Sequence, residues 1–297
     1  MDRNKIEFRK VRDFGAILNV TFDYIKRNFK TLFKSNLLIS APAILLAGVF
    51  LGLYQTSMFD FAVTPDLQQF GIPFLLSTFF LMISYLIVMV VTYSHLMVYK
   101  KSETGIFDIE EVWDVTKQNF LMILATGIGY SLILGLVAVI FVGIGMFLVM
   151  QGSYGFIFLV LVGIGILIYL SINYSLIFIV RFEEGVSFSE SLSRSKELIS
   201  NNWWFTFGLI IVVGMIQGFL MYALYIPTYI VMFFMAFTGF NAGTSSLTRI
   251  LLIITSIITS LSVLFYMIST IAISFHYYNL VERKEAPGLL QQIENIK

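Results

Sequence analysis

Uncharged, largely apolar residues fill five long stretches of the chain, and the lengths of these stretches predict its helices. The stretches cover 204 of the 297 residues and comprise residues 35–59, 67–99, 118–180, 198–248 and 250–281. A helix needs about 20 mainly apolar residues to cross the hydrocarbon core of a membrane. The longest stretch can hold two spans and each of the others one. The pattern therefore predicts an all-α integral membrane protein with six transmembrane helices.

The two longest stretches decide this count. The longest contains a turn, because the glycines and serine of Gln151–Gly155 interrupt both of its apolar runs. The next longest is expected to form one span from Trp203 to about Phe234, kinked at Pro227. The alternative is a break near Pro227, which would create a seventh span and move the basic C-terminal residues to the opposite side of the membrane.

The positions of the positive charges predict the orientation. In the six-span arrangement 18 of the 19 Lys and Arg residues lie on one side, and Arg249 is the exception. The positive-inside rule then places both termini in the cytoplasm. We expect a single membrane domain over residues 1–297. Residues 1–34 would form a cytoplasmic amphipathic segment, 35–280 the six-span bundle and 281–297 a cytoplasmic tail.

Composition excludes other classes of protein. Hydrophobic residues make up 58% of the chain and charged residues 12%, about half the charged share of a typical soluble domain. The 30 Phe and 15 Tyr exclude a disordered chain. Cysteine is absent, which excludes disulfides and thiolate sites. We expect no cleaved signal peptide, because the opening segment is too long and too basic.

Amphipathic stretches just before each odd-numbered span indicate an internal repeat. Each ends at an Asn followed by an aromatic residue, at Asn28, Asn119 and Asn202. The even-numbered spans also end alike, in a charged turn followed by Gly105, Gly185 or Gly288. These features predict three units, each an interfacial helix plus a transmembrane hairpin. The alternative is chance similarity among apolar helices.

The segment Ser187–Asn202 shows the expected interfacial helix most clearly. Ser187 or Ser189 can cap its start, and Glu190 follows Ser187 by three residues, as in a capping box. Its apolar stripe is expected to point into the bilayer or the bundle, and comprises Phe188, Leu192 and Ile199.

The interfacial helices allow two interpretations. They can anchor the bundle at the lipid headgroups, or they can form a cytoplasmic docking surface for a partner, which suits the acidic second helix. The candidate docking residues are Glu190, Arg194, Glu197, Asp108 and Glu111.

Small residues at helical spacing predict where the spans pack closely, because they let helix backbones approach each other. The candidates are Gly48, Gly52, Ser131, Gly135, Gly214 and Gly218. We expect Gly214 and Gly218 to lie against another helix of the chain, in contact with small residues of a neighbouring span such as Gly127, Ser131 or Gly135.

No pattern of residues indicates catalysis, so we expect no catalytic residue, cofactor or metal and no enzymatic activity. The spans contain no Asp, Glu, Lys or Arg, which argues against an ion-coupled pump. Asn173 and Gln217 are the candidate intramembrane polar residues and are expected to hydrogen-bond across helices. His95 and His276 are interpreted as interfacial residues beside neighbouring tyrosines, because a metal site would need a third ligand.

The segment at 188–208 carries a resemblance to a known family. It reads Phe188-x-Glu190-Ser191-Leu192-x-Arg194-Ser195-x-x-Leu198, then Asn202-Trp203-Trp204-x-Thr206-Phe207-Gly208. This resembles bacterial six-span proteins related to the membrane domain of glycerophosphoryl diester phosphodiesterase. The resemblance implies a non-catalytic partner in the bacterial inner membrane. A phosphodiesterase label would name the relative and not the activity, since this chain has no segment for the catalytic barrel.

Two functional hypotheses follow. The first is a non-enzymatic scaffold or accessory subunit, whose partners are the lipid bilayer and other inner-membrane proteins or further copies of itself, with no nucleic acid. The second is a transporter or lipid-handling protein, which the repeat favours and the lack of an evident polar pathway disfavours. A membrane-embedded enzyme is a more distant third.

Overall fold

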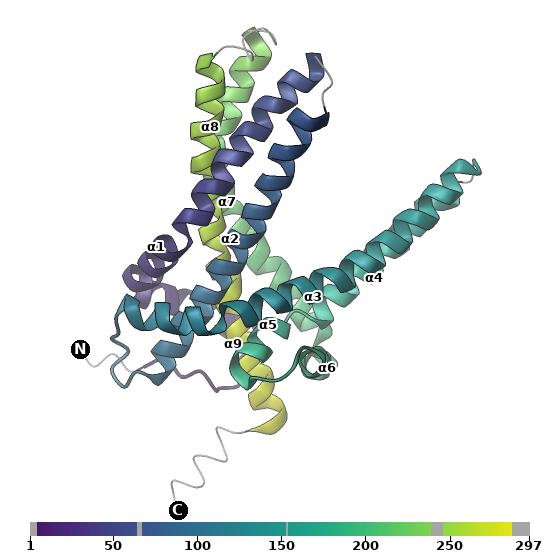
Figure 1. Ribbon diagram of the computed structural model, residues 1–297. Coiled ribbons are helices and arrows are strands. Elements are labelled where there is room, and N and C mark those ends of the chain that lie inside the picture. Colours follow the sequence, from purple (N-terminus) through teal and green to yellow (C-terminus); the bar gives the residue numbers. More distant parts are fainter. Residues whose placement is uncertain (1–4, 64–66, 153, 239–245, 287–297) are drawn as a thin grey trace, which may run out of the picture. The chain divides into compact units, whose positions relative to one another are not determined.

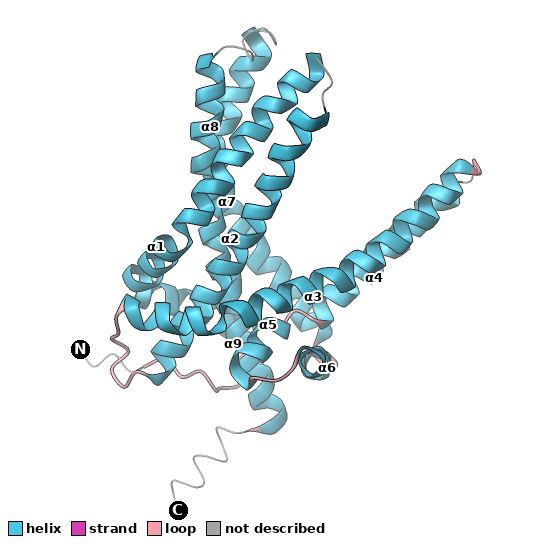
Figure 2. Cartoon of the chain, viewed as in Figure 1, coloured by secondary structure: helices cyan, strands magenta, loops and turns pink. Residues whose placement is uncertain are grey.

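The computed structural model describes residues 5–63, 67–152, 154–238 and 246–286, and within these ranges the chain forms helices and no strand (Figures 1 and 2). The described residues include six helical segments long and apolar enough to cross a membrane. The protein is therefore an all-α, six-span membrane protein, as its sequence predicts. Ser153, Asp66 and Gly288 lie outside the described residues.

Nine α-helices and one short 3-10 helix make up the described chain. They are α1 (Phe14–Val63), α2 (Leu67–Lys101), α3 (Ile109–Met150), α4 (Gly155–Asn173), α5 (Ile177–Glu184), α6 (Phe188–Ile199), α7 (Trp203–Thr238), α8 (Ser246–Ser260), η2 (Leu261–Phe265) and α9 (Tyr266–Glu285). The fourth span combines α4 and α5, and the sixth combines α8, η2 and α9. Helix α7 passes through Pro227 without a break, so the seven-span alternative is wrong.

The first two expected interfacial helices are not separate elements. Helices α1 and α3 run for 50 and 42 residues and continue directly into the first and third spans. At about 1.5 Å per residue both are far longer than a hydrocarbon core of about 30 Å. Neither contains Gly or Pro at the expected junction, whereas Ser200, Asn201 and Asn202, which are weak helix formers, separate α6 from α7. The expected boundary after residue 34 is therefore not a structural break.

The starts of α1 and α3 share a capping pattern with that of α6. Asp13 Oδ1 accepts a 2.7 Å hydrogen bond from the backbone N–H of Ala16. At α3 the Glu111 carboxylate accepts a 3.0 Å bond from the backbone N–H of Asp108. Asp108 and Glu111 therefore define the start of a helix, and both are exposed.

The ends of the even-numbered spans also share a feature. The backbone turns left-handed at Gly105 (φ 71°), Gly185 (φ 66°) and Ala286 (φ 47°). Glycine adopts this conformation without steric cost and ends many helices. In the third expected repeat this residue is an alanine, Ala286, two positions before the predicted Gly288. Equivalent chain reversals after each hairpin support the expected repeat.

The chain divides into two compact units. Unit 1 comprises Met1–Val20, Lys117–Ile211 and Ala272–Lys297, and unit 2 comprises Thr21–Thr116 and Val212–Ile271. Helices α4, α5 and α6 belong to unit 1, and α2, α8 and η2 to unit 2.

Close helix packing in unit 2 uses Gly48 and Gly52 of α1. A Cβ atom placed on Gly48 would lie 2.6 Å from the Cα atom of Ile257, and one on Gly52 would lie 2.6 Å from the Cα atom of Ile253. Only glycine fits where backbones approach this closely. The packing prediction for Gly48 and Gly52 is confirmed, and their neighbour is α8.

The packing prediction for Gly214 and Gly218 stays a prediction, because these glycines belong to unit 2 and their expected partners on α3 belong to unit 1. A Cβ atom placed on either would meet no atom of its own unit within 4 Å. Within unit 2, a polar contact between α7 and α9 is made by Gln217, which accepts a hydrogen bond from Ser269.

The partners expected for these glycines, on α3, are also open. Ser131 and Gly135 are exposed, and a Cβ atom placed on Gly135 would meet no atom of unit 1 within 4 Å. The spacing of small residues therefore locates one close helix contact, between α1 and α8, within unit 2.

Candidate functional site

The start of α6 is fixed by two reciprocal hydrogen bonds. The backbone N–H of Glu190 donates to Ser187 Oγ at 3.3 Å, and the backbone N–H of Ser187 donates to the Glu190 carboxylate at 2.8 Å. The predicted capping box is confirmed. The hydrogen bonds from Ser187 hold the pKa of the exposed Glu190 below its ordinary value.

The buried face of α6 differs in part from the predicted apolar stripe. Phe188 and Leu192 are half-buried and Ile199 is fully buried. The other residues that α6 buries are Ser191, Ser195 and Leu198. The face is therefore more polar than the apolar pattern predicts.

Ser195 joins α6 to the break between α4 and α5. Its hydroxyl donates a 2.7 Å hydrogen bond to the backbone carbonyl of Asn173 and accepts a 3.3 Å bond from the backbone N–H of Leu176. Backbone groups at a helix break lack intrahelical partners. This buried serine supplies a partner on each side of the break, which explains a polar residue on the buried face.

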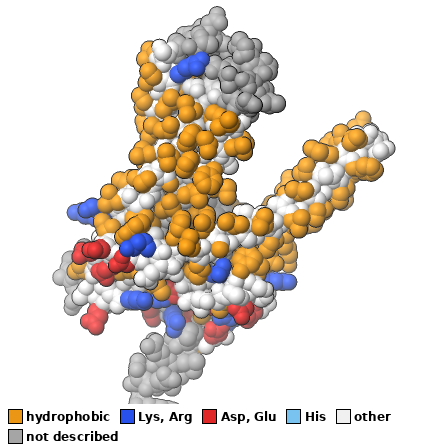
Figure 3. Space-filling model, viewed as in Figure 1, with side chains coloured by type: hydrophobic (Ala, Val, Ile, Leu, Met, Phe, Trp, Pro, Cys, Tyr) orange, Lys and Arg blue, Asp and Glu red, His pale blue; other side chains and the backbone are white. Residues whose placement is uncertain are grey.

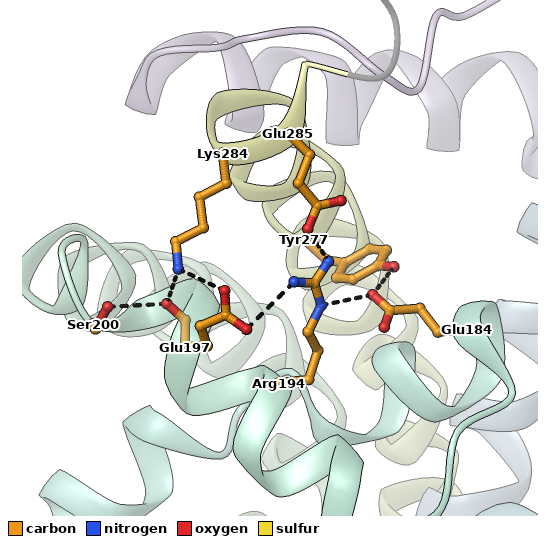
Figure 4. Close-up of polar contacts among 7 residues, drawn as sticks. All are labelled: Glu184, Arg194, Glu197, Ser200, Tyr277, Lys284 and Glu285. Atoms are coloured by element: carbon orange, nitrogen blue, oxygen red, sulfur yellow. Dashed lines mark hydrogen bonds and ion pairs between the residues drawn. The ribbon is translucent and has the colours of Figure 1, made fainter.

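Arg194 lies at the centre of an ionic cluster that joins α5, α6 and α9 (Figure 4). Its Nε donates to Glu184 Oε1 at 3.2 Å, and its Nη2 donates to Glu285. Its Nη1 lies 3.5 Å from Glu197 Oε2. Lys284 Nζ also bonds Glu197, at 3.2 Å from Oε1. We call these five residues the Arg194 cluster.

The cluster shifts the pKa values of its members. Burial lowers the pKa of Arg194, but its hydrogen bonds with Glu285 and Glu184 outweigh burial and raise it above its ordinary value. The hydrogen bond from Lys284 holds the pKa of Glu197 below its ordinary value. Two of the predicted docking residues, Arg194 and Glu197, are thus ion-paired within the chain, whereas Glu190 lies outside the cluster.

The N-terminal segment is tied to α9. The backbone N–H of Arg12 donates a 2.7 Å bond to Asn279 Oδ1, and Arg283 Nη2 donates a 2.8 Å bond to the backbone carbonyl of Arg12. The ring of Phe8 packs edge-on against Tyr278, with ring centroids 5.2 Å apart. Burial lowers the pKa of Arg12. The opening residues are therefore an integral part of unit 1.

Both histidines are fully buried and hydrogen-bonded, so their interpretation as interfacial residues is wrong. In unit 2, His95 Nδ1 lies 2.7 Å from the Tyr24 hydroxyl, and its Nε2 lies 3.2 Å from Thr31 Oγ1. In unit 1, His276 Nε2 lies 2.8 Å from Thr206 Oγ1. No group of three or more His, Asp or Glu side chains in the described chain could hold a metal ion.

The two histidines occupy equivalent positions in the repeat. His95 precedes Gly105 by ten residues, and His276 precedes Ala286 by ten residues. In the second of the three expected sequence repeats the equivalent position is Ser175, ten residues before Gly185. Each histidine faces a threonine on the preceding odd-numbered span, which is a shared structural role.

The two candidate intramembrane polar residues behave differently. Gln217 bonds Ser269 across helices, as predicted. The side chain of Asn173 instead donates a 2.8 Å bond to the backbone carbonyl of Tyr169 in its own helix. The cross-helix prediction for the Asn173 side chain is wrong, because its amide bonds a carbonyl one turn back along α4.

A groove of about 590 Å³ opens beside the turn from α6 to α7. Its aromatic lining comprises Tyr169, Trp203, Trp204 and Phe205. Its polar lining comprises Lys196, Ser200, Asn201, Asn202 and Asn173. The groove lies within unit 1 and combines one cationic side chain with amide and hydroxyl groups and a large aromatic surface.

Sequence reasoning missed the carboxylates that surround Arg194 and missed the groove. The signal for the carboxylates was present, since the charged turns after the fourth and sixth spans contain Glu184 and Glu285. The sequence does not show that these carboxylates pair with Arg194, because Arg194 and Glu285 are 91 positions apart along the chain.

The fold and these sites define the protein as a six-span α-helical membrane protein with an ion-paired end formed by α5, α6 and α9. Comparison of the chain with family models, curated proteins and solved structures gave no match. The resemblance at 188–208 stays a prediction.

Proposed function

We propose that the protein is a non-enzymatic scaffold or accessory subunit of a complex in the bacterial inner membrane, with both termini in the cytoplasm. The observation that carries this proposal is the surface of the hairpin formed by α3 and α4. The charge distribution along the chain supports the orientation.

The α3–α4 hairpin exposes apolar side chains on several faces within unit 1. Leu132, Leu136 and Phe158 expose 68%, 65% and 73% of their surface. Figure 3 shows hydrophobic side chains along its length. Inside the hairpin the helices do touch, since a Cβ atom placed on Gly163 would lie 2.9 Å from the Phe141 ring. No other described part of unit 1 covers the outer faces of α3 and α4, where these exposed side chains lie.

Small residues interrupt this apolar surface. A Cβ atom placed on Gly135, Gly143 or Gly165 would meet no atom of unit 1 within 4 Å. In lipid, helices associate through such residues, because they allow backbones to approach and increase van der Waals contact. The surface therefore suits a helix of a second membrane protein. Lipid and the chain's own unit 2 are the competing occupants.

The ion-paired end of unit 1 supports a scaffold role. The Arg194 cluster links α5, α6 and α9, and Arg12 adds the N-terminal segment. Four parts of the chain are thereby held in a fixed arrangement. A docking subunit benefits from such pre-organisation, since less freedom is lost on binding.

Purification from native membranes in mild detergent tests this proposal. We expect a second membrane protein at a constant ratio, and we expect Gly143→Leu to lower that ratio by filling the contact surface. Gly71→Leu is the matched control, because Gly71 also has no neighbouring atom within 4 Å but lies in α2. Recovery of the bare chain from wild type, or equal losses for both variants, would contradict the proposal.

A lipid-handling function is the second candidate, and the groove beside α6 and α7 favours it. An aromatic wall next to a cationic side chain is the composition expected where an apolar chain meets a headgroup. Proteoliposomes that move labelled phospholipid faster than empty vesicles would support this candidate. Equal rates would remove it.

A further inference from the structure

The groove beside the α6–α7 turn contains a set of hydrogen-bond donors that the described chain leaves unused. Lys196 forms no ion pair with any described residue. The cations of the neighbouring Arg194 cluster differ, since Arg194 and Lys284 both contact carboxylates. The unpaired positive charge of α6 is therefore the one that lines the groove.

Three further donors, on residues that line the groove, lack partners among the described residues. The indole Nε1 of Trp203 is buried and has no acceptor. The side-chain amides of Asn201 and Asn202 form no hydrogen bond within the described ranges, although the Asn202 backbone is bonded on both sides. Buried donors in proteins are nearly always satisfied. A donor-rich groove with a buried unpaired N–H indicates a missing acceptor.

The start of α7 adds backbone donors to the same place. In the first turn of α7, the first backbone N–H group that forms a hydrogen bond is that of Thr206, which donates to the carbonyl of Asn202 at 2.9 Å. The N–H groups of the three preceding residues have no intrahelical acceptor. These residues, 203–205, all line the groove. The partial positive charge of a helix start favours an anion there.

Aromatic rings also line the groove, on Tyr169, Trp203, Trp204 and Phe205. Trp203 stacks on Tyr169 with ring centroids 5.9 Å apart and on Phe207 at 5.3 Å. Trp204 is largely exposed. Tryptophan concentrates at the boundary between hydrocarbon and headgroups. The lining of the groove thus combines positive and donor groups with apolar rings.

We propose that this groove binds the phosphate group of an anionic phospholipid, held by Lys196 and the start of α7, with Trp203 and Trp204 against the acyl chains. A phosphate oxygen accepts from an ammonium group, amides and backbone N–H groups together. Free phosphate shares the headgroup chemistry but has nothing to place against the aromatic wall. The site does not depend on the scaffold role, because no partner protein contributes to it.

Binding of short-chain phospholipids to the full-length detergent-solubilised protein tests the site. We expect dioctanoyl phosphatidylglycerol to bind more tightly than dioctanoyl phosphatidylcholine, and Lys196→Gln to weaken the former about tenfold, as loss of a charged hydrogen bond does. Lys26→Gln is the matched control, since it removes an exposed positive charge on α1. Equal effects of the two variants would overturn the site. Inorganic phosphate that binds as tightly as the lipid would overturn the lipid assignment.

A second measurement reads the position of the acyl chains and does not depend on affinity. In a Trp113→Phe background the remaining tryptophans are Trp203 and Trp204. Phosphatidylglycerol brominated on its acyl chains should quench their fluorescence more than brominated phosphatidylcholine, and Lys196→Gln should remove the difference. Equal quenching by the two lipids in the parent protein would overturn the proposal even if every variant folds.

Discussion

Among the residues of unit 1 that the structure describes, Arg194 contacts three carboxylates. It reaches carboxylates on α5 and α9 as well as one on its own helix. Its side chain is 21% exposed, so solvent weakens these contacts only in part. Lys cannot replace this geometry fully, because a guanidinium presents several donors in a fixed fork and an ammonium does not.

Removal of the guanidinium should destabilise the protein. We expect Arg194→Ala to lower the free energy of unfolding by about 1–2 kcal/mol, a value reduced for partial exposure. The reason is that Glu184 and Glu285 would face each other without a cation. Arg194→Lys should recover part of the loss, and Lys101→Ala, at an exposed position, should change little. Thermal unfolding in detergent measures this, and an unchanged midpoint for Arg194→Ala would contradict the role of the cluster.

The carboxylate of Glu197 should make stability depend on acid pH. Its folded-state pKa is lowered by the hydrogen bond from Lys284. A lowered pKa gives stability that is full above the unfolded-state value of about 4.3 and is lost as pH falls through the folded-state value. Glu197→Gln should therefore show a smaller fall in melting temperature between neutral and acid pH. An identical fall in variant and wild type would show that Glu197 is not coupled to folding.

At the scale of elements, α6 is held by a polar contact as well as by apolar burial. Ser195 bonds the backbone at the break between α4 and α5. A buried carbonyl that is left without a hydrogen-bond donor lowers the stability of the folded protein by most of its desolvation free energy. This contact attaches α6 to the break in the fourth span, so α6 is not a loosely attached surface helix.

The matched pair Ser195→Ala and Ser193→Ala tests this contact. Ser195→Ala should destabilise the protein by about 1–3 kcal/mol, because the Asn173 carbonyl is left without the hydroxyl. Ser193 is exposed on the same helix, so Ser193→Ala should be nearly neutral. Unfolding followed by loss of helical circular dichroism measures both. Similar values for the two variants would show that burial alone holds α6.

Glycine substitutions separate the packing contacts of the spans. Gly48→Leu should destabilise unit 2 by at least about 1–3 kcal/mol, since overpacking against Ile257 forces the backbones apart. Gly214→Leu should have little effect, because that position is open. The melting temperatures of the two variants in the same detergent measure this difference in stability. A larger loss for Gly214→Leu would instead support the predicted packing of α7 on α3.

The elements were predictable where the signal is local. Apolar run length gave the six spans, and the spacing of Ser187 and Glu190 gave the capped start of α6. The facing surfaces were not predictable, because the GxxxG spacing occurs both at Gly48 and at Gly214, and the spacing alone does not say which helix lies against either. The ion pairs of Arg194 and the groove at Trp203 depend on segments far apart in sequence, so no local pattern contains them.

For the whole molecule, the orientation in the membrane is a prediction that labelling can test. The chain has no cysteine, so a single introduced cysteine reports one position. Gln151→Cys, in the turn between α3 and α4, should react with an impermeant thiol reagent in intact cells. Ser193→Cys, on α6, should react only after the membrane is opened. The reverse pattern would place the termini outside.

The scaffold role rests on what covers the α3–α4 hairpin. A photo-crosslinking amino acid at Leu136, exposed on α3, should give adducts larger than the protein by the mass of a second polypeptide. The same amino acid at Ile123, buried on the same helix, should not. Adducts at Leu136 that form only with lipid, or only within the same chain, would contradict the proposal that this hairpin docks on a neighbouring membrane protein.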